Sequence, residues 1–152
     1  MSALAKTAVA FLLSFTAATW HPGGGDFKCF EDYRCITDTS SPQWVLQKEA
    51  TTDENGLRKI DGAYCVALGS AFGSEIGSTY VITLSGGSEF LAILADQKAD
   101  QDTIGDHTRD RSGAVVEFVV ETEKLPGEVR ASGDVSALPE FAGSVVKIRR
   151  ME

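Results

Sequence analysis

The segment Tyr64–Asp102, YCVALGSAFGSEIGSTYVITLSGGSEFLAILADQKADQD, decides the fold of this chain. It contains three short apolar runs, at Tyr64–Leu68, Thr79–Leu84 and Phe90–Ala95, and glycine- and serine-rich breaks separate them. Each run has the length of a strand, is rich in β-branched or aromatic residues, and is bounded by turn-forming residues. Asp96 follows the third run directly, so we expect a carboxylate at the mouth of a small sheet.

Further strands are predicted on both sides of this segment. Ala114–Val120, AVVEFVV, has the strongest strand character, and Gly143–Arg149 is predicted as the last strand. Tyr33–Thr37 is a candidate early strand, Gln43–Glu49 is a short strand or a helical turn, and the polar stretch Gln97–Gly113 is predicted to be a long functional or disordered loop. About six short strands with little helix predict a mainly β fold, a small closed six-stranded β-barrel, since closure removes exposed strand edges.

The N-terminal part, residues 1–25, is predicted to be separate from a β-barrel domain at 26–152. Thr7–Ala18 is a short apolar run that follows one positive charge and ends in small residues, which is typical of a signal peptide. The run is too short for an ordinary membrane span. If it is retained, we expect an apolar helix that docks into a groove, another subunit or lipid. The glycine-rich linker at 20–25 joins it to the barrel domain.

The composition limits the classes of partner. The formal net charge of −8 and the pI near 4.7 predict no binding to nucleic acid, which requires a basic stripe. A neutral cell-wall glycan, a peptide or a protein partner is compatible with this charge. Cys29 and Cys35 would form a local disulfide if the chain is exported, and Cys65 is interpreted as a small buried hydrophobic residue.

Two carboxyl residues are the main candidates for catalysis. Asp96 ends an apolar run, where burial favours the protonated form that donates a proton to a glycosidic oxygen. The alternative is a strand-end aspartate that caps backbone N–H groups. Glu117 lies in a strongly apolar strand and would complete a carboxylate pair for glycoside cleavage. Its structural alternative is a salt bridge to Lys98, Arg109 or Arg111.

His107 is the third candidate, as a proton shuttle near neutral pH, and the alternative is an ordinary exposed histidine. The polar loop around it also carries carboxylates that could bind Ca²⁺, but their spacing does not match an EF-hand. No phosphate-binding loop, dinucleotide fingerprint or CxxC pair is present in the sequence. We therefore expect a solvated acidic loop, no metal and no cofactor. The carboxylates considered for Ca²⁺ are those of Asp96, Asp100, Asp102, Asp106 and Asp110.

The order of these segments resembles that of the double-psi β-barrel group. That group includes the rare-lipoprotein-A-like proteins, the lytic transglycosylases of the A family, and the three-aspartate domain of wall-acting and resuscitation-factor proteins. Residues 76–80 are similar to its Gly-Thr-x-Val-Tyr segment, Ala95-Asp96 to its Ala-Asp pair, and Glu117 to its later acidic residue. Gly69-Ser70 stands where its first aspartate is expected. Residues 33–148 also resemble uncharacterised secreted proteins of gut Firmicutes.

This resemblance implies a wall-glycan enzyme, or a degenerate relative of one, in which one aspartate acts as acid and base on the glycosidic bond. The first hypothesis is therefore a peptidoglycan-cleaving barrel, secreted or at the cell envelope, with Asp96 as general acid/base and Glu117 assisting. The second is a non-catalytic assembly module of an envelope or virion particle, docked through the apolar N-terminal segment. The third is a carbohydrate-binding module with exposed aromatic side chains. The aromatic candidates are Trp20, Trp44, Tyr64 and Tyr80.

Overall fold

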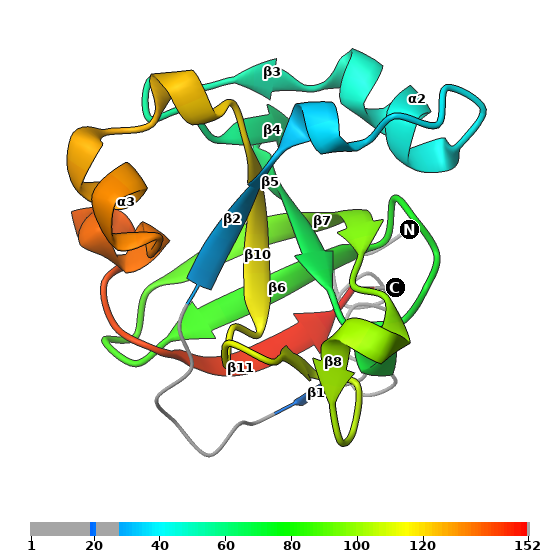
Figure 1. Cartoon of the computed structure of the whole chain (residues 1–152). Helices are drawn as coiled ribbons and strands as arrows, with labels where there is room; N and C mark the ends of the chain where they lie inside the picture. The colour runs from blue at the N-terminus through cyan, green and yellow to red at the C-terminus, as the bar shows by residue number, and fades with distance from the viewer. Residues whose placement is uncertain (1–18, 21–27, 152) are drawn as a thin grey trace, which may run out of the picture.

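The computed structural model describes residues 19–20 and 28–151, which form a mainly β fold (Figure 1). The strands are β1 (Thr19–Trp20), β2 (Lys28–Asp32), β3 (Thr51–Thr52), β4 (Arg58–Ile60), β5 (Ala63–Leu68), β6 (Thr79–Leu84), β7 (Glu89–Gln97), β8 (Thr103–Ile104), β9 (Arg109–Asp110), β10 (Val116–Val120) and β11 (Val145–Arg150). The helices are α2 (Pro42–Glu49) and α3 (Gly127–Ser132), and the 3-10 turns are η1 (Tyr33–Cys35), η2 (Ser70–Phe72), η3 (Asp100–Asp102), η4 (Thr122–Lys124), η5 (Val135–Ala137) and η6 (Pro139–Phe141). The predicted N-terminal apolar helix lies outside the described residues. Among those residues, no helix is both long and apolar enough to span a membrane.

The strands predicted within the central segment are confirmed as β5, β6 and β7, and the two later strands are confirmed as β10 and β11. The predicted strand at Tyr33–Thr37 is wrong, because the chain turns there: Asp32 accepts a hydrogen bond from the N–H of Arg34 (2.9 Å) and starts η1. The strand lies one segment earlier, at β2. Of the two alternatives for Gln43–Glu49, the structure has the helical one, α2, because the Ser41 hydroxyl caps its first turn.

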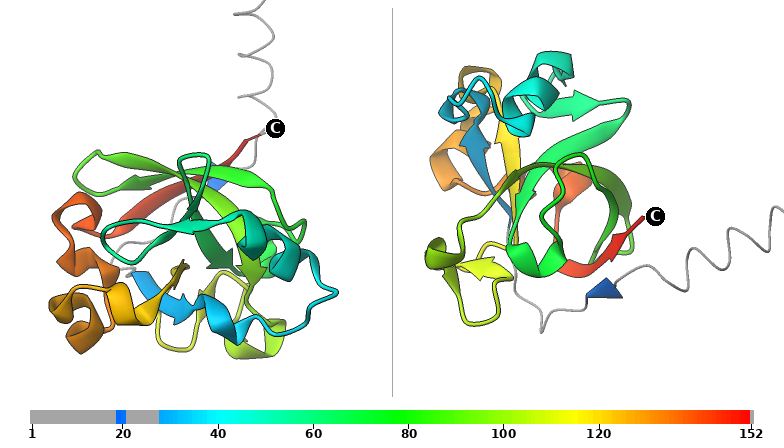
Figure 2. Two further views of the ribbon diagram at one scale, coloured as in Figure 1. Left: turned by 90° about the horizontal axis from the view of Figure 1, so that it is seen from above. Right: turned by 90° about the vertical axis from the view of Figure 1, so that its right-hand side faces the viewer.

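The main sheet runs in the order β1-β11-β6-β7-β5-β10-β2 and mixes parallel with antiparallel pairs. β2 pairs with β10 and β5 pairs with β7 in parallel, whereas the other neighbours along this path are antiparallel. The sheet is strongly curled (Figure 2). No closed barrel is found among residues 19–20 and 28–151, contrary to the prediction. The path ends at β1 and β2, and η5 packs beside β2 where a further strand would close the sheet.

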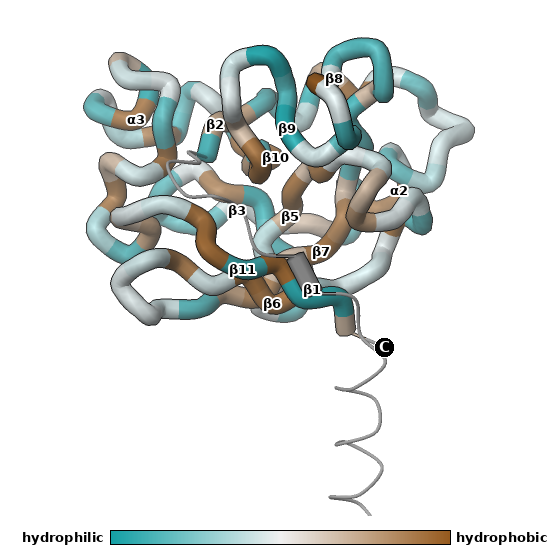
Figure 3. The backbone as a smooth tube through the Cα atoms, turned by 90° about the horizontal axis from the view of Figure 1, so that it is seen from below, coloured by the Kyte–Doolittle hydropathy of each residue, from teal (hydrophilic) through white to brown (hydrophobic). Residues whose placement is uncertain are grey.

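The sheet separates two apolar clusters. The larger one contains the inward side chains of five strands, such as Leu68, Ile82 and Phe118, together with Phe141 from η6. The smaller one lies on the other face and consists of Ala63, Cys65, Ile93, Ala95 and Val119. In Figure 3 the central strands are mainly apolar, whereas the turn beside β9 is mainly polar. The smaller cluster occupies only part of its face, which leaves the rest of that face for polar side chains.

The polar stretch Gln97–Gly113, predicted as a long functional or disordered loop, contains short regular elements. It forms η3 and a short hairpin in which Thr103 pairs with Asp110 and Ile104 with Arg109. The hairpin reaches back to the end of β5, where the His107 carbonyl accepts a hydrogen bond from the N–H of Ala71 (3.2 Å). This approach requires glycine at position 69, since a Cβ there would lie 2.0 Å from the His107 carbonyl oxygen.

Candidate functional site

A β-bulge in β7 decides which way Asp96 points. Along the β5–β7 pair, Val66 is opposite Leu94 but Ala67 is opposite Asp96, so Ala95 is an extra residue in β7. Side chains alternate between the faces of a strand, so a regular β7 would place Asp96 on the same face as Leu94, in the larger core. The bulge turns Asp96 to the other face instead. Bulges commonly re-aim a side chain next to a functional site.

On that face, register places four residues in one row across four strands. Ala67 of β5 is opposite both Asp96 of β7 and Glu117 of β10, and Glu117 is in turn opposite Cys29 of β2. Paired residues project to the same side of a sheet. The small side chain of Ala67 therefore lies between two carboxylates and leaves space between them.

This space is a cavity of about 320 Å³. Asp96 and Glu117 both line it, so the structure brings together two of the three predicted site residues. A further carboxyl residue, Glu31, enters from β2, where it is opposite Val119. The complete lining is Glu31, Ala67, Asp96, Gln97, Lys98, Ala99, Asp102, Asp110 and Glu117.

Glu31 is the most perturbed carboxyl group of this cavity. Its burial, a hydrogen bond with Asp96 and the negative charges of Asp96 and Glu117 raise the pKa of Glu31 to about 9, against a small opposing effect of Lys98. The Oε1 atom of Glu31 is fully buried and has no hydrogen-bond partner in the described part of the chain. Two carboxyl groups can share a hydrogen bond when one of them keeps its proton. Glu31 is therefore a neutral acid at pH 7 that donates to Asp96.

Asp96 also makes the contact that its structural alternative predicts. Its Oδ1 accepts a hydrogen bond from the N–H of Gln97 (2.9 Å), which fixes the carboxylate at the end of the strand. This bond and the contact with Glu31 are compatible, since a carboxylate has acceptor sites on both oxygens. The side chain is half-buried and borders the cavity, so Asp96 remains accessible to a ligand.

Lys98 is the cation of the site. Its ammonium group, on a side chain only 4% exposed, lies 2.9 Å from Asp110 Oδ2. The salt bridge proposed between Lys98 and Glu117 is thus directed to Asp110 instead. Although burial opposes it, hydrogen bonds from Ser112 and Lys98 lower the pKa of Asp110, which keeps this carboxylate ionised. One buried cation therefore faces several acidic groups in the cavity, and this excess of acid favours a retained proton.

Cys29 completes the row beside Glu117. Its thiol lies 3.4 Å from Glu117 Oε2 and 3.9 Å from Asp110 Oδ2, and burial and the neighbouring carboxylates raise its pKa far above the ordinary value. Ligand atoms of Cys29, Asp110 and Glu117 lie within 4.8 Å of one another, a spacing compatible with a metal ion. Without an ion, the Cys29 thiol keeps its proton and shares it with Glu117. The three residues are thus a hydrogen-bonded group in this structure.

The cysteine pairing expected for an exported chain is not formed. All three cysteines are free thiols: Cys29 is directed to the carboxylates of the cavity, Cys65 is buried in the smaller apolar cluster, and Cys35 is exposed at the end of η1. Burial also raises the pKa of Cys65, to about 11. The three thiols therefore have different surroundings.

His107, the third predicted site residue, lies apart from this cavity. Its Nδ1 is 3.0 Å from the Thr103 hydroxyl and 3.6 Å from Asp100 Oδ1, and the side chain is 47% exposed. Its backbone has a φ of +61°, which serves the tight turn between β8 and β9. The structure thus places His107 in the hairpin turn and outside the residues that line the cavity.

Sequence reasoning missed Glu31 and the position of Lys98. The signal for Glu31 was present in the stretch KCFED, where Cys29 and Glu31 alternate with Phe30. Phe30 packs against the larger core, so its two neighbours must face the other side of the sheet. Placing a strand at Lys28–Asp32 would have identified Glu31 as a half-buried acid.

Comparison with known proteins adds no relative to this picture. No protein-family model matches the chain, and no curated protein matches it significantly. The residues of the site therefore carry the functional argument by themselves.

Proposed function

We propose that the protein cleaves the glycan strands of peptidoglycan by acid/base catalysis in the Asp96 cavity, as a lytic transglycosylase or a glycosidase does. The observation that carries this proposal is the Glu31–Asp96 pair, in which a buried carboxylic acid keeps its proton at neutral pH beside an accessible carboxylate. Glycoside cleavage needs a proton donor at the leaving oxygen and a negative group near the developing positive charge of the sugar. The cavity offers both.

Each residue has a distinct part in the proposed reaction. The proton held between Glu31 and Asp96 passes from Asp96 to the glycosidic oxygen as the bond from that oxygen to the anomeric carbon breaks. Glu117, across Ala67, stabilises the positive charge that develops on the sugar ring. Asp96 then accepts the proton of the attacking hydroxyl group, which comes from water or from the same sugar, and the pair is restored.

The size and surroundings of the cavity support a sugar-sized substrate. Its volume of about 320 Å³ is at the lower end of ligand pockets, which suits one ring of a polymer and not a large cofactor. Two parallel strand pairs in a curled mixed sheet support kinship with the double-psi β-barrel group. A wall-glycan substrate also means that the protein acts outside the cell or at its envelope.

The proposal is tested by incubating purified protein with isolated cell-wall sacculi and measuring the soluble fragments released. Wild type should release fragments, and Asp96→Asn should lose this activity by about 100-fold or more, the usual contribution of a general acid/base group. Glu89→Gln, at the opposite end of the same strand, is the matched control and should be as active as wild type. Sacculi left intact by wild type would exclude the enzyme, and binding without cleavage would favour the carbohydrate-binding alternative.

A further inference from the structure

A line of hollows leads away from the Asp96 cavity over the surface. A second hollow, of about 270 Å³, borders Asp96 on one side and the segment between η1 and α2 on the other. A third, of about 620 Å³, lies beyond it at the start of α2. Asp96 lines the first two hollows, and Ile36 and Thr37 line the second and the third. We call this line of hollows, which runs from Asp96 to Trp44, the Asp96–Trp44 groove.

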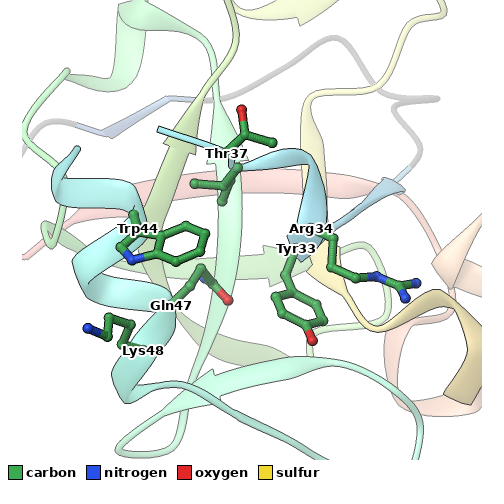
Figure 4. Close-up of a pocket in the computed structure, with 7 residues that line it drawn as sticks. Tyr33, Arg34, Thr37, Trp44, Gln47 and Lys48 are labelled. Carbon is green, nitrogen blue, oxygen red and sulfur yellow. The ribbon is translucent and has the colours of Figure 1, made fainter. Parts of the chain in front are cut away.

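The far end of the groove is an aromatic pocket. Trp44 projects from α2 on one side, Tyr33 projects from η1 on the other, and Gln47 lies between them (Figure 4). The guanidinium of Arg58 lies 4.4 Å from the centre of the Tyr33 ring, and this cation–π contact stabilises the position of the ring. Arg58 also donates to the Gln47 side-chain oxygen (3.0 Å) and backbone oxygen (2.8 Å). The floor of the pocket is therefore fixed before any ligand enters.

Gln47 lines this pocket and is itself almost completely buried. The residue is 7% exposed, and its side-chain Nε2 has no hydrogen-bond partner among the described residues. The Cys65 thiol, which also interacts with the Gln47 side chain, is a weak acceptor. A buried donor without a strong partner costs stability. Because Nε2 is itself buried, the part of Gln47 that lines the pocket is the rest of its side chain.

We propose that the Asp96–Trp44 groove binds a neutral oligosaccharide strand, with one sugar ring between Trp44 and Tyr33 and another at Asp96. This proposal rests on the proposed function and names where the rest of its substrate lies. A sugar ring has an apolar C–H face for an aromatic side chain and oxygens at its edge for Thr37 and Lys48, two exposed polar residues of the lining.

The experiment measures binding of β-1,4-linked N-acetylglucosamine oligomers by calorimetry, with the disaccharide and the hexasaccharide as probes. Wild type should bind the hexasaccharide at least ten-fold more tightly than the disaccharide, because the longer chain reaches the aromatic pocket. Trp44→Ala should remove that difference, and Trp44→Phe, which keeps a ring, should restore most of it. Val45→Ala, on the same helix but 55% exposed and outside the pocket lining, should behave as wild type.

The outcomes separate this inference from the proposed function. Asp96→Asn should lose cleavage of sacculi but keep the length-dependent binding. Length-dependent binding that Trp44→Ala leaves unchanged, in a protein that circular dichroism shows to be folded, would overturn the groove even if wild type cleaves sacculi. Equal binding of the two oligomers by wild type would overturn it as well. Length-dependent binding without any cleavage would keep the groove and reject the enzyme.

Discussion

Glu31 keeps its proton because of its place in the sheet. Glu31 is the residue that β2 contributes to the cavity lining. Because β2 lies parallel to β10, Glu31 is opposite Val119 and close to Glu117. Ionising Glu31 would add a further negative charge beside Asp96 and Glu117 and would leave it buried. A neutral Glu31 instead donates a hydrogen bond. The electrostatics of this cavity thus depend on a proton that the fold itself retains.

This retained proton predicts how stability depends on pH. The pKa of Glu31 is raised from its ordinary 4.5 to about 9, so the folded state holds a proton that the unfolded state releases. The stabilisation is complete below pH 4.5 and is lost as the pH rises towards 9. Glu31→Gln cannot ionise and still donates to Asp96, so it should be more stable than wild type by about 1 kcal/mol or more at pH 8.

Urea denaturation of wild type and Glu31→Gln between pH 5 and pH 9 measures this difference. The gap in the free energy of unfolding should widen as the pH increases. Glu128→Gln, an exposed residue in the first turn of α3, is the matched control and should follow wild type throughout. Parallel curves for wild type and Glu31→Gln would contradict a protonated Glu31.

At the scale of elements, strands that carry an apolar run were predictable and their pairing was not. The sequences of β5, β6 and β7 are apolar runs bounded by turn-forming residues, and the strand predicted for each run is confirmed. β2 gives a weak signal, because Phe30 is its only large apolar residue. The bulge at Ala95 is a property of the β5–β7 pair, and no residue type marks it. The direction of Asp96 therefore could not be obtained from the sequence.

The contact between the β8–β9 hairpin and the end of β5 gives an element-scale prediction. Gly69→Ala would place a methyl group against the His107 carbonyl oxygen and push the hairpin outwards. We expect a loss of about 1–3 kcal/mol in the free energy of unfolding, as for other overpacked sites, measured by urea denaturation. Gly86→Ala, in a turn where nothing lies within 4 Å of the new atom, should change stability little. Equal stability of the two variants would show that the hairpin does not pack here as described.

This contact also excludes an acidic side chain at position 69, directly after β5. An aspartate at that position would meet the hairpin backbone, since even a Cβ does not fit. The third acid of the cavity comes from another strand, because Glu31 of β2 lines the same cavity as Asp96 and Glu117. Carboxyl groups from β2, β7 and β10 thus meet in one place, although more than sixty residues separate Glu31 from Asp96.

At the scale of the whole molecule, the net charge of −8 governs encounters with a charged polymer. Cell-wall sacculi carry carboxylates, so long-range repulsion opposes binding until salt screens it. The screening length falls to about 10 Å at 0.1 M salt. We expect binding of sacculi, measured by co-sedimentation, to increase several-fold between about 20 and 200 mM salt.

Chitin provides the control for this charge effect, because it is an uncharged polymer of similar rings. Its binding should change little over the same range of salt. A decrease in sacculus binding with added salt would instead indicate a local basic contact that outweighs the net charge.

The free thiol of Cys35 offers a practical way to observe the groove. It is exposed and borders the hollow that joins Asp96 to the aromatic pocket, whereas burial raises the pKa of both Cys29 and Cys65 and makes them unreactive. A maleimide dye should therefore attach at one position without any engineered cysteine. Emission from that dye would report each passage of a ligand along the protein surface.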